Sequence, residues 1–405
     1  MEISFDNTEI AFAYKSTSEL KKSRFLFKSM ALNWLVYIGT RLTPWALKMH
    51  LPINWLIRAT IFKQFVGGET LQDTQEVVSI LERYGVEVIL DYGIEGMQTE
   101  VDFERAKNEF IAVIKYASSQ PNIPYISIKI TAFARFELLE KVHEITDVVS
   151  VLNGHVNKKE LNELESREWI AITHRLEEIC NMAEVVKVKI LIDAEESWIQ
   201  NPIDSLSIQM MRKYNNEKVV IYNTVQLYRS DRLVFLKKMI DASFHDKYLL
   251  GVKLVRGAYM EKERARATKM NYVSPIHLNK NTTDTDFNNG VSLCLDNIQK
   301  LKLIVATHNE YSNLYTTKLL TEKGMSLSHP HVHFSQLYGM SDNITFNLAK
   351  NGCSVSKYLP FGPLNEVVPY LMRRAQENSS VSGQTGRELG LIEKEILRRK
   401  NVTSL

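Results

Sequence analysis

The sequence predicts a TIM-like (β/α)8 barrel that follows an N-terminal helical segment. From about residue 85 onward, short β-branched apolar runs recur, and the stretches between them are long enough to hold a helix, which is typical of repeated βα units. Polar and charged side chains gather at or near the ends of these runs, where barrels of this class place their catalytic groups. An open doubly wound sheet is the alternative fold, but no GxGxxG motif follows the first run.

We expect one strand in each of eight runs. They are VEVILDYG (86–93), YISIKITAF (125–133), VKILIDAE (188–195), VVIYNTVQ (219–226), LGVKLVRGAY (250–259), KLIVATHN (302–309), VHFSQLYG (332–339) and SVSKYLPFG (354–362). Eight parallel strands favour a closed barrel. The barrel is expected over residues 85–405, after a helical segment over residues 1–84.

Two local features refine this division of the chain. Gly67 and Gly68 predict a turn within the N-terminal segment. The stretch over residues 134–186 is longer than one barrel helix needs, and it is polar around residues 153–168. We therefore expect a helical insertion over 134–186.

Composition and charge are those of an ordinary globular protein. Hydrophobic residues make up 44% of the 405 residues, and 50 basic against 47 acidic residues leave a net charge of +3, which argues against wholesale nucleic-acid binding. Cys180, Cys294 and Cys353 are odd in number and widely spaced, so they indicate neither a disulfide framework nor a CxxC metal site. The first residues lack the features of a signal or transit peptide. We expect a cytoplasmic protein.

A basic segment over residues 21–63 is the strongest local bias in the chain, since no acidic residue lies between Glu19 and Glu69. Its basic and tryptophan residues are Lys21, Lys22, Arg24, Lys28, Trp34, Arg41, Trp45, Lys48, Trp55, Arg58 and Lys63. No stretch reaches the roughly 18 apolar residues that span a bilayer, but helices of this kind can lie on an anionic membrane surface. The alternative is helices packed across a barrel end with solvated lysines. We expect peripheral docking at the inner membrane.

The helix expected after the eighth run carries Tyr370, Arg373, Arg374 and Glu377 at i, i+3, i+4 and i+7, and therefore on one face. Two guanidinium groups beside an aromatic ring and a carboxylate can bind a small carboxylate in bidentate fashion, with the glutamate positioning one arginine. If the face points outward, it is a charged surface only. Gly362 and the proline after it favour a sharp turn above the barrel rim, and we therefore predict a carboxylate clamp.

Three carboxylates follow the third run, at Asp193, Glu195 and Glu196. Alternation places the first two on the same side, where Lys129 can neutralise the inward-facing one. A divalent metal site built with His308 is the alternative, although no second well-spaced histidine and no D-x-D pattern supports it.

The fifth and sixth runs end in groups that suit a flat or anionic ligand. Lys253 and Arg256 can stabilise negative charge, and the small residues that follow let a ring or a phosphate approach the backbone. Basic residues at strand ends are also commonly just solvated. Thr307 and His308 add hydrogen-bonding side chains after the sixth run.

Taken together, the motifs resemble those of the proline dehydrogenase family, of the monofunctional FAD-dependent type. FVGGET, KLVRGAY, ATHN, FSQLYGM and YLPFGPLNEVVPYLMRRAQEN occur in family order over nearly the whole chain, and the last is highly specific. The resemblance implies oxidation of L-proline to Δ1-pyrroline-5-carboxylate, with FAD as cofactor and a membrane quinone as electron acceptor. It also implies one activity, because the chain lacks the length for an aldehyde dehydrogenase module.

The resemblance assigns roles residue by residue. The residues that match catalytic positions are Asp193 and Lys253. Those that match the substrate pocket are Lys129, Leu337, Tyr358, Tyr370, Arg373, Arg374 and Glu377. Those that match flavin contacts are Ala194, Gln226, Arg256, Gly257, Ala258, Thr307 and His308. No metal ligand is implied.

One departure and several alternatives stay open. Bifunctional bacterial members carry Arg where Lys253 stands and Lys where Arg256 stands, so a bidentate contact cannot be assumed at the first position. A dehydrogenase of hydroxyproline or another cyclic imino acid differs in the groups near the ring, where the bulk of Tyr358 favours unsubstituted proline. More distant alternatives are a metal-dependent lyase and a noncatalytic barrel that binds a carboxylate.

Overall fold

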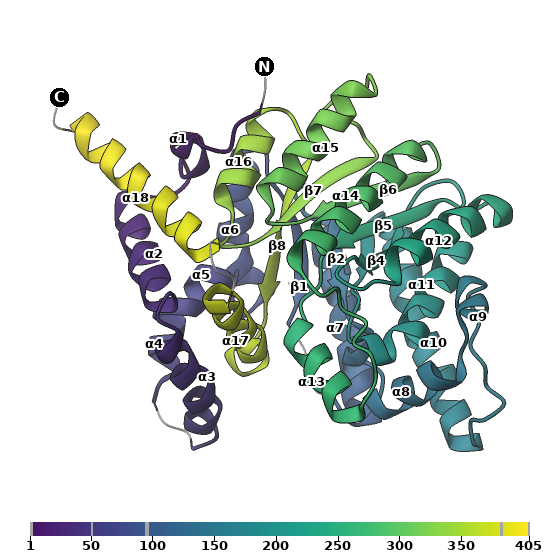
Figure 1. Ribbon diagram of the computed structural model, residues 1–405. Coiled ribbons are helices and arrows are strands. Elements are labelled where there is room, and N and C mark those ends of the chain that lie inside the picture. The colour runs from purple at the N-terminus through teal and green to yellow at the C-terminus, as the bar shows by residue number, and fades with distance from the viewer. Residues whose placement is uncertain (1–2, 50–51, 94–96, 381–383, 404–405) are drawn as a thin grey trace. The chain divides into compact units, whose positions relative to one another are not determined.

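In the computed structural model, which describes residues 3–49, 52–93, 97–380 and 384–403, eight strands form a closed barrel in chain order (Figure 1). The strands are β1 (Glu87–Tyr92), β2 (Tyr125–Ile128), β3 (Lys189–Ile192), β4 (Ile221–Gln226), β5 (Leu250–Val255), β6 (Leu301–Ala306), β7 (Val332–Leu337) and β8 (Val355–Phe361). Seven of the predicted runs contain one strand each, and β6 begins one residue before the run at 302–309. The predicted (β/α)8 barrel is therefore confirmed.

Parallel pairing fixes which side chains are neighbours along the sheet. β4 pairs with β5 so that Thr224 lies opposite Lys253, and β1 pairs with β8 so that Ile89 lies opposite Tyr358. Parallel neighbours need a crossover connection, which is usually a helix. Each connection between consecutive strands here contains at least one helix.

The chain divides into two compact units. One comprises Met1–Ile94 with Ser335–Leu405, and the other comprises Glu95–Phe334. They are called unit 1 and unit 2 below, and each is described by itself. The division expected from the sequence, at residue 84, stays a prediction.

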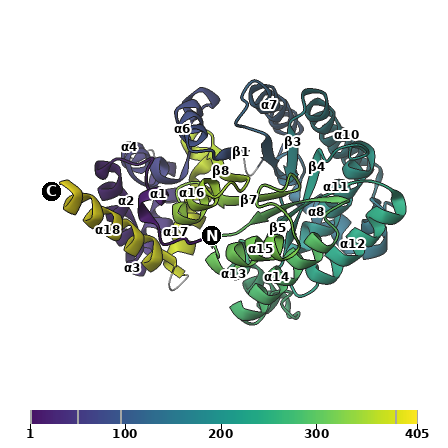
Figure 2. The ribbon, with the colours of Figure 1, turned by 90° about the horizontal axis from the view of Figure 1, so that it is seen from above.

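In unit 2, helices cover the outer side of the strands, and Figure 2 shows this for the strands β3, β4 and β5. The helices are α7 (Glu100–Ser118), α8 (Phe136–Ile145), α9 (Val148–Leu152), α10 (Glu163–Val186), α11 (Gln200–Tyr214), α12 (Arg232–Asp246), α13 (Met260–Met270), α14 (Lys280–Asp296) and α15 (Glu310–Glu322), with short 3-10 turns η2 (Ile130–Ala132) and η3 (Ser197–Ile199). Residues 134–186 hold α8, α9 and α10. The last begins with a capping box, in which the side chains of Asn162 and Glu165 bind each other's backbone N–H.

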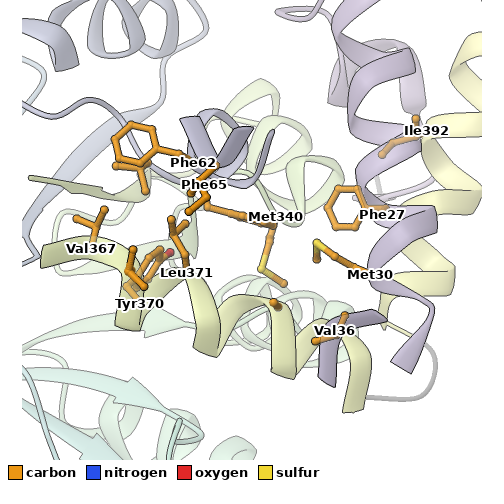
Figure 3. Packing of buried hydrophobic residues seen from close by; sticks show 14 of the residues in the cluster. Phe27, Met30, Val36, Phe62, Phe65, Met340, Val367, Tyr370, Leu371 and Ile392 are labelled. Carbon is orange, nitrogen blue, oxygen red and sulfur yellow. The ribbon is translucent and has the colours of Figure 1, made fainter. Parts of the chain in front are cut away.

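Unit 1 contains helices from both ends of the chain, and α18 lies alongside α2 (Figure 1). The helices are α1 (Thr8–Ala11), α2 (Thr17–Met30), α3 (Asn33–Lys48), α4 (Asn54–Ile57), the π-helix η1 (Arg58–Phe62), α5 (Lys63–Phe65), α6 (Leu71–Arg83), α16 (Asp342–Lys350), α17 (Leu364–Ser380) and α18 (Gln384–Thr403). Several of these helices share a buried apolar cluster that includes Phe27, Phe65, Met340 and Leu371 (Figure 3). None of the described helices is long and apolar enough to cross a membrane.

The turn predicted at Gly67 and Gly68 is wrong. The two glycines lie along β8, where the N–H of Gly67 donates to the Pro360 carbonyl at 2.8 Å and the carbonyl of Gly68 accepts from the N–H of Gly362 at 3.0 Å. A Cβ at Gly67 would lie 2.8 Å from the side chain of Leu359. Glycine is needed at position 67 because the side chain of Leu359 lies against its backbone, and not because the chain reverses.

Candidate active site

The carboxyl ends of neighbouring strands in unit 2 carry most of the predicted site residues. Lys129 follows β2, Asp193 and Ala194 follow β3, Gln226 ends β4, Lys253 lies within β5, Arg256, Gly257 and Ala258 follow β5, and Thr307 and His308 follow β6. Because parallel strands bring their carboxyl ends to one edge, these groups lie at the same end of the strands of unit 2.

Asp193 and Lys253 form an ion pair between β3 and β5. Lys253 is buried, and the backbone N–H of Asp193 donates to the Ile128 carbonyl at 2.9 Å, which fixes the start of the loop after β3. Burial opposes ionisation of Asp193, but the charges of Lys253 and Lys129 prevail and lower its pKa. The carboxylate of Asp193 bonds to Lys253 of β5, whereas the charge of Lys129 contributes less to the lowered pKa.

Glu195 is buried, and its carboxylate, backbone N–H and carbonyl all form hydrogen bonds. Its carboxylate accepts the backbone N–H of Thr131 at 3.1 Å and the Thr131 hydroxyl at 2.5 Å. Its backbone N–H donates to Gln200 Oε1 at 2.9 Å, and its carbonyl accepts from Gln226 Nε2 at 2.9 Å. Burial and the neighbouring Glu196 raise the pKa of Glu195 to about 7.

This raised pKa predicts a stability that falls as the pH rises. The unfolded chain releases the Glu195 proton near the ordinary glutamate pKa of 4.5, whereas the folded chain keeps it up to about 7. Stability is therefore lost between these two values, by on the order of 3 kcal/mol. We expect Glu195→Gln, which stays neutral, to flatten the dependence of denaturant stability on pH between 5 and 7.5. An unchanged pH dependence in the variant would contradict this assignment.

Arg256 is fixed by partners that sequence reasoning did not find. Its guanidinium pairs with Asp284 of α14, with 2.8 Å from Nε to Oδ1, and donates to the hydroxyl of Ser312 at 2.9 Å and to that of Thr307. Its central carbon lies 4.4 Å from the ring centroid of Phe287. The predicted contacts Arg256 and Thr307 are therefore brought together. Asp284 carried no signal, because nothing in its spacing links it to a strand 28 residues earlier.

Two features of unit 2 suit a flat, polar ligand. Gln226 is buried, and none of the described residues forms a hydrogen bond with its Oε1, although its Nε2 is bonded. Gly257 has a φ of +143°, and a Cβ there would lie 2.4 Å from the ring of Tyr228. Glycine is needed here because of this φ and because the ring of Tyr228 lies directly against the backbone, while Gly257 and Ala258 themselves are exposed.

In unit 1, α17 carries the predicted clamp. Arg374 is buried, its Nη2 lies 2.5 Å from Glu377 Oε1, and its guanidinium carbon lies 5.2 Å from the ring centroid of Tyr370. The predicted contact between Glu377 and one arginine is thus made with Arg374. Burial raises the pKa of Glu377, against the opposing charges of Arg374 and Arg373.

The other predicted site residues of unit 1 lie in β7 and β8, and β8 directly precedes α17 in the chain. β8 ends at Phe361 and α17 begins at Leu364, so the connection is as short as Gly362 and its proline predicted. Tyr358 is half-buried in β8, and its carbonyl accepts from the N–H of Tyr338 at 2.9 Å, next to Leu337. The hydroxyl of Tyr370 is buried, and it has no hydrogen-bond partner among the described residues.

The metal alternative finds no support in the geometry. Over the described ranges of the chain, no three His, Cys, Asp or Glu side chains are grouped so that they could hold a metal ion. The carboxylates of Asp193 and Glu195 instead bond to Lys253 and Thr131.

Comparison with known proteins gives the family. The family model described as "Proline dehydrogenase" matches residues 74–387, which include β1 to β8 and α17. The chain belongs to the proline dehydrogenase family. Proline dehydrogenase 1, mitochondrial, of Dictyostelium discoideum is 30% identical over 97% of this chain and 74% of its own length. Hydroxyproline dehydrogenase of Xenopus laevis is also 30% identical, over 96% of this chain and 88% of its own length.

Solved structures of other proteins share the fold. Proline utilization A (PutA) from Bdellovibrio bacteriovorus, inactivated by N-propargylglycine, matches with a TM-score of 0.68 and 19% identity. The match covers 93% of this chain, which spans only 37% of that PutA chain. At this identity the likeness shows the barrel and its surrounding helices, and no more.

Proposed function

We propose that the protein is a flavin-dependent dehydrogenase that oxidises L-proline to Δ1-pyrroline-5-carboxylate. The observation that carries the proposal is the buried Arg374, which lies beside the ring of Tyr370 and against Glu377 on α17, within the part of the chain that matches the family model. A buried guanidinium beside an aromatic ring suits a small substrate with one carboxylate and an apolar ring.

Substrate recognition is the role proposed for unit 1. Arg373 and Arg374 bind the carboxylate, and Glu377 holds Arg374 in one orientation through its 2.5 Å contact. Tyr370, Tyr358 and Leu337 supply the walls of the pocket. Such a clamp orients a small substrate, and orientation alone can account for a large part of an enzyme's rate enhancement over the uncatalysed reaction.

Cofactor binding is the role proposed for the carboxyl ends of β3, β4, β5 and β6. The residues that would hold FAD are Ala194, Gln226, Arg256, Gly257, Ala258, Thr307 and His308. The bonded amide nitrogen of Gln226 leaves its buried Oε1 available to a ligand. A flavin held by these residues would supply the acceptor for the hydride that leaves the substrate carbon.

The ion pair of Asp193 and Lys253 is proposed to be catalytic. The buried ammonium of Lys253 would stabilise the negative charge of a reduced flavin. Asp193 keeps that ammonium in one position. The guanidinium groups of Arg373 and Arg374 disfavour a positive charge on the bound substrate, so they lower the pKa of its ammonium. The substrate nitrogen can then lose its proton without a dedicated base.

Hydroxyproline is the second candidate substrate, because the two relatives named above are equally identical to this chain. The bulk of half-buried Tyr358 favours the unsubstituted ring. The deciding experiment compares kcat/KM for L-proline and trans-4-hydroxy-L-proline in the purified protein, after its visible spectrum has been recorded. We expect flavin bands and a higher kcat/KM for proline. No flavin bands, and none regained on adding FAD, would contradict the proposal, whereas a preference for hydroxyproline would change the substrate alone.

We further propose that the protein docks on an anionic membrane surface and passes its electrons to a quinone there. On α3, Trp34 is 62% exposed and Tyr37 is 56% exposed, and Trp55 of α4 is 67% exposed. The guanidinium of Arg41 lies 4.2 Å from the ring centroid of Tyr37. Exposed tryptophans among basic residues suit the boundary between lipid headgroups and acyl chains. Two of these basic residues are paired within the chain, Lys28 with Glu393 and Arg58 with Glu69. The side chains of Trp45 and Lys48 lie outside the described residues.

Vesicle co-sedimentation tests the docking surface. We expect the protein to bind vesicles of phosphatidylcholine with phosphatidylserine more than vesicles of phosphatidylcholine alone. The double variant Trp34→Ala/Trp55→Ala should lose most of this binding. Each tryptophan that becomes buried in the membrane contributes on the order of 2 kcal/mol to the binding free energy. The matched control is Leu278→Ala in unit 2, where the leucine is 95% exposed. Equal sedimentation of all three proteins would contradict docking through this surface.

The relative from Dictyostelium discoideum is named as mitochondrial. The cytoplasmic location expected from the sequence stays a prediction.

A further inference from the structure

The loop over residues 337–341, between β7 and α16, is fixed by a buried lysine. Lys357 of β8 is fully buried, and its Nζ lies 2.5 Å from the Met340 carbonyl and 3.4 Å from the Leu337 carbonyl. Its third neighbour is Asp342, with 2.9 Å from Nζ to Oδ1. A buried ammonium is costly unless its donors are satisfied, and here the satisfying oxygens belong to the loop and to the first residue of α16.

Two further side chains hold the same loop from other helices. Gln64 of α5 donates through Nε2 to the Gly339 carbonyl at 2.7 Å. Glu388 of α18 accepts the backbone N–H of Ser341 at 2.5 Å. Three separate elements, β8, α5 and α18, therefore bind polar backbone groups of one short loop.

The backbone of the loop needs this support. Ser341 has a φ of +51°, a left-handed conformation that costs a non-glycine residue roughly 1 kcal/mol. Gly339 has a φ of +79°, and a Cβ there would lie 2.0 Å from the Gln64 carbonyl. A loop with two left-handed residues keeps its shape only where its surroundings fix it.

The loop is joined to the proposed substrate pocket at three points. Leu337 is a proposed pocket wall, and the N–H of Tyr338 donates to the carbonyl of Tyr358 at 2.9 Å. Met340 belongs to the same buried cluster as Tyr370 and Leu371 of α17 (Figure 3). A shift of the loop would therefore move groups that bind the substrate.

We propose that Lys357 is a positioning residue for substrate binding, which acts by holding the 337–341 loop and through it the pocket wall. This inference rests on the proposed function. Lys357 touches neither substrate nor cofactor in this role, because its ammonium is directed to Met340, Leu337 and Asp342. Its effect is expected on the affinity for the substrate more than on the chemical step.

The first test is Lys357→Met, which keeps the length of the side chain and removes its donors. We expect the KM for L-proline to rise about tenfold or more, because displacements of about 1 Å can cost up to a hundredfold, while kcat changes by less than about threefold. Hydrogen exchange should become faster at the amides of residues 338–341 and stay unchanged across unit 2. The matched control is Lys394→Met on α18, whose exposed ammonium donates to the Asp6 carbonyl.

A second pair of variants keeps the inference testable if Lys357→Met does not fold. Glu388→Leu removes the acceptor for the Ser341 N–H and should raise the KM, whereas Glu388→Gln keeps an acceptor oxygen and should leave the KM near that of the wild type. Faster exchange in the loop with an unchanged KM, in either Lys357→Met or Glu388→Leu, would overturn the positioning role. Wild-type protein that does not oxidise proline would instead overturn the proposed function.

Discussion

Arg374→Ala is expected to lower kcat/KM for L-proline by roughly 10- to 150-fold, mainly through a higher KM. The buried guanidinium is proposed to bind the substrate carboxylate, and a hydrogen bond to a charged group contributes about 1.5–3 kcal/mol. Because the proposed flavin contacts lie at the ends of β3 to β6 and not on α17, the amount of bound flavin should be unchanged. Steady-state kinetics with a flavin absorbance measurement on the same sample checks both statements.

Two companion variants separate charge from geometry. Arg374→Lys keeps the positive charge but loses the planar fork, so its kcat/KM should fall between those of the wild type and Arg374→Ala. Arg105→Ala removes an arginine of α7 whose side chain is 57% exposed, and it should leave the kinetics unchanged. Unchanged kinetics in Arg374→Ala would refute the carboxylate clamp.

Asp204→Leu is expected to destabilise the protein by about 3–5 kcal/mol. Asp204 of α11 is fully buried, and its carboxylate accepts from Arg232 of α12 at 2.7 Å, from Asn223 of β4 at 2.8 Å and from Gln200 at 3.0 Å. Its removal would leave the buried guanidinium of Arg232 without its counter-ion, which is the costly way to break such a pair. Urea denaturation at neutral pH measures the effect.

The double variant Asp204→Leu/Arg232→Met serves as the control. It removes both charges, so it should recover a large part of the lost stability, since apolar replacements of a buried ion pair are often close to neutral. If the single and double variants are equally destabilised, the cost comes from packing and not from the unpaired charge.

The strands and the face of α17 that carries Arg374 were predictable because their sequence signals are local. Each apolar run identifies its own strand, and the spacing of Tyr370, Arg374 and Glu377 places them on one face without reference to any other part of the chain. The short connection at Gly362 was predictable for the same reason.

The partners of these groups were not predictable, since they come from distant parts of the chain. Lys253 bonds to a carboxylate 60 residues away, and Gln64 bonds to a carbonyl 275 residues away. Gly67 shows a second limit, because glycine permits both turns and close backbone approach, and only the strand beside it decides between them. The identities of the cofactor and substrate rest on family membership, since residue types and spacing alone indicate only a small carboxylate.

Anaerobic mixing of the protein with L-proline or with pyrrolidine tests the central claim most directly. The two compounds share the ring and its nitrogen, but pyrrolidine lacks the carboxylate that Arg373 and Arg374 are proposed to bind. We predict that proline bleaches the flavin absorbance and that pyrrolidine requires at least about tenfold higher concentration to do so, as expected for the loss of a charged hydrogen bond. Equal bleaching by both compounds, or none by proline, would contradict the account.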